Sequence, residues 1–389
     1  MYKILCLNKI SPIGTKRFGE SYTFSPEMAS PDAILVRSAS MHDMELDENL
    51  LAIARAGAGT NNIPVEDCAK KGVVVFNTPG ANANAVKELV LCAMLLSSRK
   101  IGPAMDWVKT LKGQGAEVSK LVEKGKGQFA GPELSGKSLG VVGLGAIGIL
   151  VANAAHSLGM EVYGYDPFLS VDAAWRLSRS VHRSMSLDEI YANSDYITLH
   201  APSTPDTKGM VNAESLSKMR DSVRIINLAR GDLVDSAAML AALQSGKAAA
   251  YATDFPTDGM IGQENIIAMP HLGASTPESE DNCAMMAVDQ VKEYLENGNI
   301  VNSVNLPSLS MAREPGTQRI CVIHRNIPGA IADFTTVCGK AGINIENMQS
   351  KSRKDYAYTI LDVQGGDTVA AAQSLETLDA IIRVRVISA

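Results

Sequence analysis

Short apolar runs alternate with polar or helical segments over the first 80 residues of the chain. Each run is almost free of polar residues, which is typical of parallel strands buried on both faces of a sheet. Four such runs are present: Tyr2–Leu7, Ala33–Val36, Leu51–Ala56 and Val73–Phe76. The pattern predicts an α/β domain built on a parallel sheet.

A second series of apolar runs begins at Ser138, after a helical segment that ends near Arg99 and a stretch rich in Gly and Lys, 109–127. Helical segments separate these runs as well, so a second doubly wound sheet is expected. The later strands of this sheet are expected at Met160–Tyr165, Tyr196–His200, Arg224–Leu228, Ala249–Thr253 and Ile266–Met269.

The helical pattern of residues 275–297 follows the last strand of the second sheet and has no further strand there to pack on. We therefore expect this helix to return to the first domain. The first domain is then discontinuous and comprises residues 1–85 and 275–303. The second domain, residues 86–274, is inserted into it.

The remaining sequence predicts a third domain. Residues 304–316 contain two prolines and no apolar period, so they are expected to form a linker. Residues 317–389 then follow the order strand, helix, strand, strand, helix, strand. That order is typical of a ferredoxin-like module.

A glycine-rich turn joins the first strand of the second domain to its first helix. Gly143, Gly145 and Gly148 follow an apolar run and precede a helical pattern. Such a turn directs backbone N–H groups and a helix N-terminus at one place, where a pyrophosphate can bind. Asp166 ends the next strand, about 18 residues further on, where a carboxylate can bind the ribose hydroxyls and repel a 2′-phosphate. The motif predicts NAD, rather than NADP, as the cofactor.

Composition and charge narrow the range of partners. The net charge of −6 gives no electrostatic basis for binding nucleic acid or an anionic membrane. The six cysteines are dispersed, with no Cys-x-x-Cys pair and no histidine cluster at metal spacing, so no metal site is expected. The sequence shows neither a signal peptide pattern nor an apolar run of about 18 residues. A soluble cytoplasmic protein is expected.

Four segments resemble, in their order and spacing, the D-isomer-specific 2-hydroxyacid dehydrogenases, and most closely those with a C-terminal ACT domain. These segments are the glycine turn with Asp166, His200–Thr207, Ile226–Gly231 and Pro270–Thr276. The resemblance covers essentially the whole chain. It implies a Rossmann nucleotide domain inserted into a flavodoxin-like substrate domain, then a βαββαβ ACT regulatory domain, in a homodimer or homotetramer.

The resemblance also implies three catalytic residues. His271 would exchange the hydroxyl proton, and Arg230 would bind the substrate carboxylate and polarise the 2-oxo oxygen. The third residue is usually a glutamate that pairs with the histidine. Here the segment Thr253–Gly259 is one residue shorter than the family pattern and offers an aspartate instead. Asp258 is the candidate, and Glu264 is the alternative.

Other motif positions imply contacts with cofactor and substrate. The residues implied to bind the cofactor are Gly143, Gly145, Ala146, Ile147, Gly148, Asp166, His200, Ala201, Pro202, Thr204, Thr207, Ala229, Arg230, Asp254, His271 and Gly273. The residues implied to bind the substrate are Arg37, Ser38, Ala58, Gly59, Asn82 and Lys87. Arg37 and Lys87 are the candidates for a phosphate group. For Arg37, the alternative is a solvated cation at a strand end.

The ACT module suggests regulation. His324, Asn326 and Asn344 match the positions that bind the effector in serine-regulated members of the family, which implies feedback inhibition by L-serine. A module that only dimerises is the alternative. The implied reaction is oxidation of 3-phospho-D-glycerate to 3-phosphooxypyruvate by NAD⁺, the first step of L-serine synthesis. The other possibilities are a dehydrogenase for another D-2-hydroxyacid and a non-catalytic NADH-sensing protein of the same fold.

Overall fold

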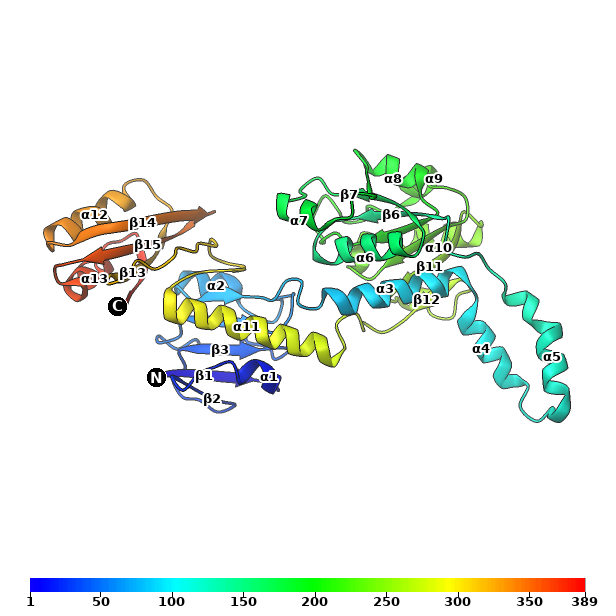
Figure 1. Cartoon of the computed structure of the whole chain (residues 1–389), viewed down its shortest axis with the longest axis horizontal. Coiled ribbons are helices and arrows are strands. Elements are labelled where there is room, and N and C mark those ends of the chain that lie inside the picture. The colour runs from blue at the N-terminus through cyan, green and yellow to red at the C-terminus, as the bar shows by residue number, and fades with distance from the viewer. Residues whose placement is uncertain (389) are drawn as a thin grey trace. The chain divides into compact units, whose positions relative to one another are not determined.

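Three separate sheets organise residues 1–388, the part of the chain that the structure, a computed structural model, describes. The sheets belong to two compact units (Figure 1). The outer unit combines Met1–Asn82 with Pro277–Ala389, and the inner unit is the continuous segment Ala83–Thr276. The nucleotide-binding motif therefore lies in a unit inserted between two parts of the other.

The first sheet of the outer unit is parallel, with the strand order β2-β1-β3-β4-β5. This is the doubly wound order of flavodoxin-like folds. Helix α11 (Pro277–Asn297) packs on this sheet and contributes Val288, Val291 and Tyr294 to the core. The strands are β1 (Tyr2–Leu7), β2 (Tyr22–Ser25), β3 (Ala33–Val36), β4 (Ala52–Arg55) and β5 (Val74–Phe76), and the short helices are α1 (Pro12–Thr15) and α2 (Val65–Lys70).

The sheet of the inner unit has seven parallel strands in the order β12-β11-β10-β9-β6-β7-β8. Its order is that of a Rossmann fold extended by one strand. The strands are β6 (Ser138–Val142), β7 (Glu161–Tyr165), β8 (His182–Arg183), β9 (Tyr196–Leu199), β10 (Val223–Asn227), β11 (Ala248–Thr253) and β12 (Ile266–Ala268). The helices that accompany them are α3 (Ala83–Ser98), α6 (Ala146–Ser157), α7 (Val171–Arg176), α8 (Leu187–Asn193), α9 (Ala213–Lys218) and α10 (Ser236–Gln244).

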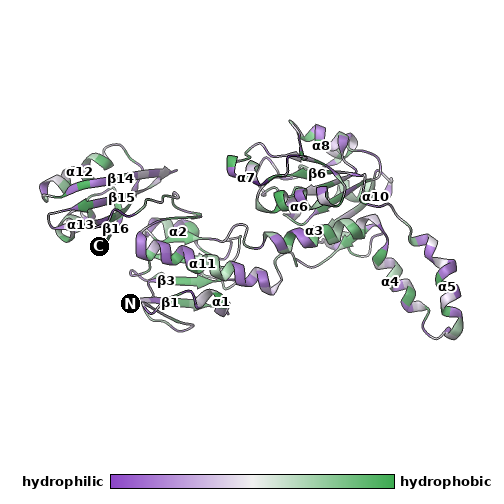
Figure 2. Cartoon of the chain, viewed as in Figure 1, coloured by the Kyte–Doolittle hydropathy of each residue, from purple (hydrophilic) through white to green (hydrophobic). Residues whose placement is uncertain are grey.

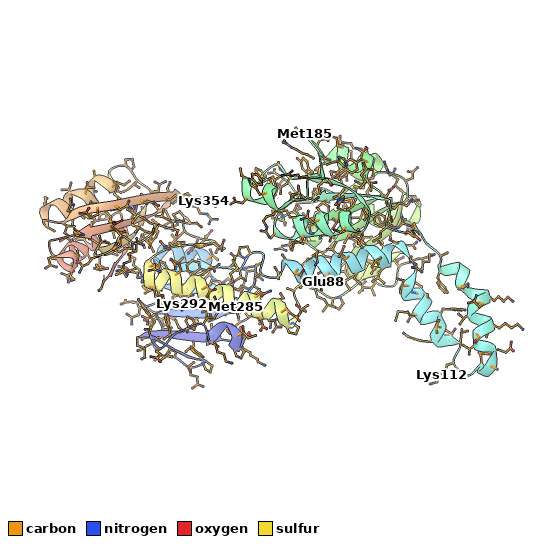
Figure 3. All side chains as sticks on the ribbon, in the orientation of Figure 1. Glu88, Lys112, Met185, Met285, Lys292 and Lys354 are labelled. Carbon is orange, nitrogen blue, oxygen red and sulfur yellow. The ribbon has the colours of Figure 1, made fainter. Side chains whose placement is uncertain are left out.

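A helical hairpin extends from the inner unit, where the sequence suggested only a stretch rich in Gly and Lys (Figure 1). It consists of α4 (Ile101–Thr110) and α5 (Val118–Gly125), and Lys112 lies at its tip (Figure 3). Neither helix contains a buried residue. Both helices mix hydrophobic and hydrophilic residues, in contrast to the largely hydrophobic strands β1 and β3 of the outer unit (Figure 2). Trp107 contacts Phe129 across the hairpin, with 5.4 Å between ring centroids.

The third sheet is antiparallel, with the order β14-β15-β13-β16, and carries two helices. Its elements are β13 (Gln318–Arg325), α12 (Ala330–Lys340), β14 (Asn344–Arg353), β15 (Tyr356–Gln364), α13 (Thr368–Glu376) and β16 (Ile381–Ile387). The predicted fold class, two doubly wound parallel-sheet domains and a ferredoxin-like module, is confirmed. The segment expected as a linker is packed, because Leu309 and Met311 are buried in the core of the outer unit.

Within residues 1–388, no helix combines the length and the apolar character that crossing a membrane requires.

Candidate active site

The turn between β6 and α6 admits only glycine at two of its positions. A Cβ atom at residue 148 would lie 1.9 Å from the carbonyl oxygen of Gly143. Gly143 has a φ of 92°, and a Cβ there would lie 2.8 Å from the carbonyl oxygen of His200. The chain therefore turns tightly enough to present the first N–H groups of α6, at Ala146 and Ile147, to a bound phosphate.

Asp166 is fixed next to this turn. Its Oδ2 accepts a 2.8 Å hydrogen bond from the backbone N–H of Leu144, and its Oδ1 accepts one of 2.8 Å from that of Phe168. The carboxylate is held at the end of β7 with part of its surface accessible. Each of its oxygens has a further lone pair with which to accept a ribose hydroxyl.

The loop that begins at His200 lies against the glycine turn. The backbone N–H of His200 donates to Val142 at 2.7 Å, and its Nε2 is 3.0 Å from the hydroxyl of Thr198. Burial lowers the pKa of His200 to about 4, so the imidazole is neutral at physiological pH. Further along, the Thr207 hydroxyl donates to the carbonyl of Pro202 at 2.6 Å and accepts from the N–H of Thr204 at 2.9 Å. These bonds fix the loop that contains the expected cofactor contacts.

Arg230 follows β10 in a loop held by a buried asparagine. The Nδ2 of Asn227 donates to the carbonyl of Arg230 at 2.8 Å, and its Oδ1 accepts from the N–H of Ala229 at 3.2 Å. Asn227 is fully buried, whereas the side chain of Arg230 is exposed. Asn227 thus positions the residues that follow the strand. It was not among the predicted site residues, although its place inside the Ile226–Gly231 segment was a usable signal.

Asp254 is a buried carboxylate at the end of β11. It is 3% exposed, and neither of its oxygens has a hydrogen-bond partner among residues 1–388. Burial raises its pKa, and the charges of His271 and Arg230 oppose that rise. A buried carboxylate without a partner is costly, and it offers an acceptor to a ligand that brings a donor.

His271 lies in the same part of the inner unit. Phe255 packs edge-on against the His271 ring, with 4.8 Å between ring centroids. Two residues further along, a Cβ atom at Gly273 would lie 3.8 Å from the Oδ2 of Asp254. The structure therefore brings together His271, Arg230 and Asp254, three of the predicted residues, at the carboxyl ends of parallel strands. Ligands bind at this edge in open α/β sheets.

Two predicted residues have less support from the geometry. Asp258 lies in a short 3₁₀ helix, η4 (Asp258–Met260), with its side chain exposed, and no ion pair joins it to His271 among the described residues 1–388. The alternative, Glu264, is exposed and 3.6 Å from Lys100. The ammonium group of Lys87 donates to Asn84 at 2.7 Å on its own helix.

The outer unit carries a second group of predicted residues, at the ends of β3 and β4. Arg37 forms a 2.7 Å ion pair with Glu280 of α11. The N–H of Ser38 donates to the side chain of Asn8 at 3.1 Å. In the glycine loop, the carbonyl of Ala58 accepts from the side chain of Asn77 at 2.6 Å. Asn82 is the last residue of the outer unit and directly precedes α3.

Arg55, which was not predicted, links these two loops. Its Nε donates to the carbonyl of Arg37 at 2.9 Å, and another of its nitrogens donates to the carbonyl of Gly59. Burial and the nearby charge of Arg37 lower the pKa of Arg55. Its place as the last residue of an apolar strand, directly before a glycine loop, was a signal that could have identified it.

The predicted effector residues occupy different environments in the third sheet. His324 is 3% exposed, and its ring nitrogens lie 2.9 Å from the carbonyl of Arg325 and 3.0 Å from the hydroxyl of Thr359. Burial lowers the pKa of His324. Asn326 and Asn344 are exposed; Asn326 donates to the carbonyl of Lys354 at 3.1 Å.

Residues 89–273 match the family described as D-isomer specific 2-hydroxyacid dehydrogenase, NAD binding domain, and residues 320–380 match the ACT domain. The chain is 32% identical over 355 residues to D-3-phosphoglycerate dehydrogenase of Haemophilus influenzae, covering 88% of this chain and 83% of the relative. It is 36% identical over 288 residues to that of Synechocystis sp., covering 72% of this chain and 50% of the longer relative.

A solved structure shows the same fold. The NAD⁺-bound 3-phosphoglycerate dehydrogenase of Entamoeba histolytica is 26% identical, with a TM-score of 0.58, and covers 79% of this chain and 99% of its own. The predictions of an NAD-binding domain and of an ACT domain are confirmed. Since a relative is matched along most of both chains, and the nucleotide-binding and ACT domains each match their family, this chain belongs to the D-isomer-specific 2-hydroxyacid dehydrogenases, among the D-3-phosphoglycerate dehydrogenases.

Proposed function

We propose that this protein oxidises 3-phospho-D-glycerate to 3-phosphooxypyruvate with NAD⁺, the first step of L-serine synthesis. The observation that carries the proposal is the grouping of His271, Arg230 and the buried Asp254 at the carboxyl end of the inner sheet, in the unit that holds the dinucleotide turn. Relatives named D-3-phosphoglycerate dehydrogenase support the choice of substrate.

The residues of the inner unit fit NAD. The glycine turn keeps the backbone free of side chains next to the first turn of α6, with open space at Gly145, and Asp166 offers carboxylate oxygens for the ribose. The unpartnered oxygens of Asp254 suit the carboxamide N–H groups of a nicotinamide. When bound, the cofactor supplies the acceptor for the hydride that leaves C2 of the substrate.

The catalytic residues then have distinct roles. The imidazole of His271 takes the proton from the C2 hydroxyl during oxidation and returns it in the reverse direction. The exposed guanidinium of Arg230 holds the substrate carboxylate and polarises the oxygen on C2. Asp258 stabilises the imidazolium that forms. The two residues form no ion pair within the described residues 1–388.

The outer unit contributes the groups that bind the anionic substrate. The N–H groups of Ala58 and Gly59 suit a carboxylate, and Arg37 suits the phosphate. Arg55 holds both loops in place through the carbonyls of Arg37 and Gly59. It is therefore a positioning residue in this proposal.

Regulation and assembly are part of the proposal. L-Serine binds at paired ACT domains, with Asn326 and Asn344 exposed for contact and His324 behind them. Strand β14 is a ten-residue exposed edge, suited to pair with the same strand of a second copy. The α4–α5 hairpin, with exposed Ile101, Met105 and Val108, suits a second contact between copies, which gives a homodimer or homotetramer.

We also propose that the protein acts in the cytoplasm. Its six cysteines are all free thiols, and five of them are buried, which suits a reducing compartment.

The test of the catalytic proposal is the initial rate of NADH oxidation with 3-phosphooxypyruvate and with hydroxypyruvate. We expect a strong preference for the phosphorylated acid, and loss of activity in His271→Ala. His182→Ala, which changes an exposed histidine of the same unit, should retain full activity. Equal rates with both acids would indicate another D-2-hydroxyacid as substrate. NADH binding without turnover of either acid would indicate a sensor protein instead.

A further inference from the structure

The antiparallel sheet packs directly on the flavodoxin-like part of the outer unit. The hydroxyl of Tyr358 donates to the carbonyl of Gly298 at 2.6 Å, just beyond α11. Cys321 packs so closely there that a Cβ at residue 298 would lie 2.4 Å from its sulfur. Cys321 and Tyr358 share one buried cluster with Tyr294 of α11. The ACT module and the substrate domain therefore form one continuous core.

Two arginines of β16 line a pocket beside this contact. Arg383 and Arg385 are two residues apart on a strand, so their side chains share the same face of the sheet. Arg383 donates to the carbonyls of Leu50 and Glu48, at 2.5 and 3.1 Å. The pocket next to them has a volume of about 440 Å³ and is bounded on its other side by residues 48–51.

Neither arginine is neutralised by a carboxylate. Among residues 1–388, no carboxylate oxygen lies within 4 Å of a guanidinium nitrogen of Arg383 or Arg385. Arg385 donates instead to the carbonyls of Tyr294 and Leu295, at 3.2 and 3.0 Å, and lies over the Tyr294 ring at 4.6 Å. These bonds use two of the five N–H groups of each guanidinium. Burial and the charge of Arg385 lower the pKa of Arg383, so an anion between them would be stabilised.

The same pocket carries two carboxylates on its rim. Glu48 precedes β4, and Glu376 is the last residue of α13; both side chains are exposed. Neither forms an ion pair in the described chain, residues 1–388. The pocket is thus lined by two guanidinium groups and two carboxylates that form no ion pairs with one another. A simple anion would satisfy the arginines but would be repelled by the glutamates.

We propose that this pocket binds a small α-amino acid as a zwitterion, with its carboxylate on Arg383 and Arg385 and its ammonium group facing Glu48 and Glu376. The site lies at the β16 edge of the sheet, whereas Asn344 belongs to β14 at the opposite edge. It is therefore separate from the effector site proposed at paired ACT domains and does not depend on it. A bound amino acid would bridge the ACT module and the substrate domain of the same chain.

The test is calorimetric titration of the full-length protein carrying Asn344→Ala, which removes a residue of the other effector site. Glycine, L-alanine and L-serine are the probes, and ethylamine and propionate each retain only one of the two charges. We expect at least one amino acid to bind, and about tenfold or weaker binding of both single-charge analogues, since each lacks one set of charge-assisted bonds.

Variants on the rim test the assignment without disturbing the packed arginines. Glu376→Gln and Glu48→Gln should each weaken amino-acid binding several-fold, whereas Glu45→Gln, an exposed glutamate outside the pocket, should have no effect. Failure of every amino acid to bind the Asn344→Ala protein would overturn the proposal. Propionate binding as tightly as the amino acids, with no effect of the glutamate variants, would show an anion site and would overturn the zwitterion assignment.

Discussion

Arg319 and Asp362 lie directly opposite each other on β13 and β15 and form a two-pronged ion pair, at 2.7 and 2.8 Å, in which both side chains are fully buried. The remaining N–H groups of the guanidinium donate to the carbonyls of Asn297, Met311 and Ala312. All five N–H groups are therefore bonded. The pair fastens the ACT sheet both to the end of α11 and to the segment that leads from it.

Replacing Asp362 by Asn should destabilise this part of the outer unit by about 3–5 kcal/mol, because it leaves a buried guanidinium without a counter-charge. Hydrogen exchange measured by mass spectrometry should show loss of protection in peptides from β13, β15 and the end of α11. Asp355→Asn, which alters an exposed aspartate in the β14–β15 turn, is the matched control. If Asp362→Asn keeps the hydrogen-exchange protection of the unaltered protein, the Arg319–Asp362 pair does not stabilise this part of the outer unit.

Asp254→Asn should stabilise the protein in the absence of cofactor but reduce its activity. The folded-state pKa of Asp254 is raised, so the native state binds its proton more tightly than the unfolded state, and stability decreases as the pH rises through that pKa. The asparagine variant removes this loss. Urea unfolding followed by far-UV circular dichroism is a suitable measurement. If the variant is no more stable than the original protein at pH 7.5, the buried Asp254 carboxylate does not destabilise the protein.

His200 should make the inner unit sensitive to acid. Its folded pKa of about 4 lies below the ordinary value of 6.5, so the unfolded state takes up a proton between these values. Stability from this residue is complete above pH 6.5 and decreases as the pH falls toward 4. Between pH 7.5 and 5 the loss should be about 2 kcal/mol.

The His200→Gln variant should lose less stability over that pH interval, as judged by the same urea unfolding followed by circular dichroism. His156→Gln, at an exposed position on α6, should behave like the original protein. Equal acid sensitivity of His200→Gln and the original protein would exclude His200 as the source.

Asp258→Asn should lower the rate of 3-phosphooxypyruvate reduction. Removal of the carboxylate takes away the negative charge that stabilises the imidazolium form of His271, which donates the proton. A loss of about 10- to 100-fold in kcat/KM is expected. Asp258→Glu should retain activity, and Glu264→Gln should change nothing. A loss in Asp258→Glu as large as that in Asp258→Asn would contradict a role of the carboxylate charge.

Arg37→Gln should raise the KM for 3-phosphooxypyruvate by about 30-fold, the equivalent of about 2 kcal/mol for a lost charge-assisted bond. The KM for hydroxypyruvate, which has no phosphate, should change little. Lys9→Gln removes a nearby exposed charge and serves as the control. An equal effect on both acids would assign Arg37 to the carboxylate rather than the phosphate.

The sequence predicted the parts of the fold that have a local signal. The buried strands are visible in the sequence as apolar runs. The turn at Gly143 and Gly148 is visible as a motif because close contacts exclude any residue other than glycine at these positions. Strand β2 was missed because only Tyr22 of its four residues is buried. The hairpin of α4 and α5 was missed because the Gly and Lys residues of 109–127 suggested an irregular stretch, although both helices carry an amphipathic period.

Site residues whose roles depend on tertiary contacts were harder to predict. Arg55 acts through carbonyl groups of two loops that are separate in the sequence, and Asn227 acts through backbone atoms that any residue would carry. The packing of the segment 304–316 against α11 and the ACT sheet was equally invisible, because its prolines and serines suggest a linker wherever they lie.

The insertion of one unit into the other sets the order in which the chain can fold during synthesis. The inner unit is continuous from Ala83 to Thr276, so all of its sheet is available once that stretch has left the ribosome. The core of the outer sheet is completed only when α11 has been made, about 200 residues after β5. Until then its apolar strands lack the cover that α11 provides, and exposed apolar strands of an incomplete sheet are prone to aggregate.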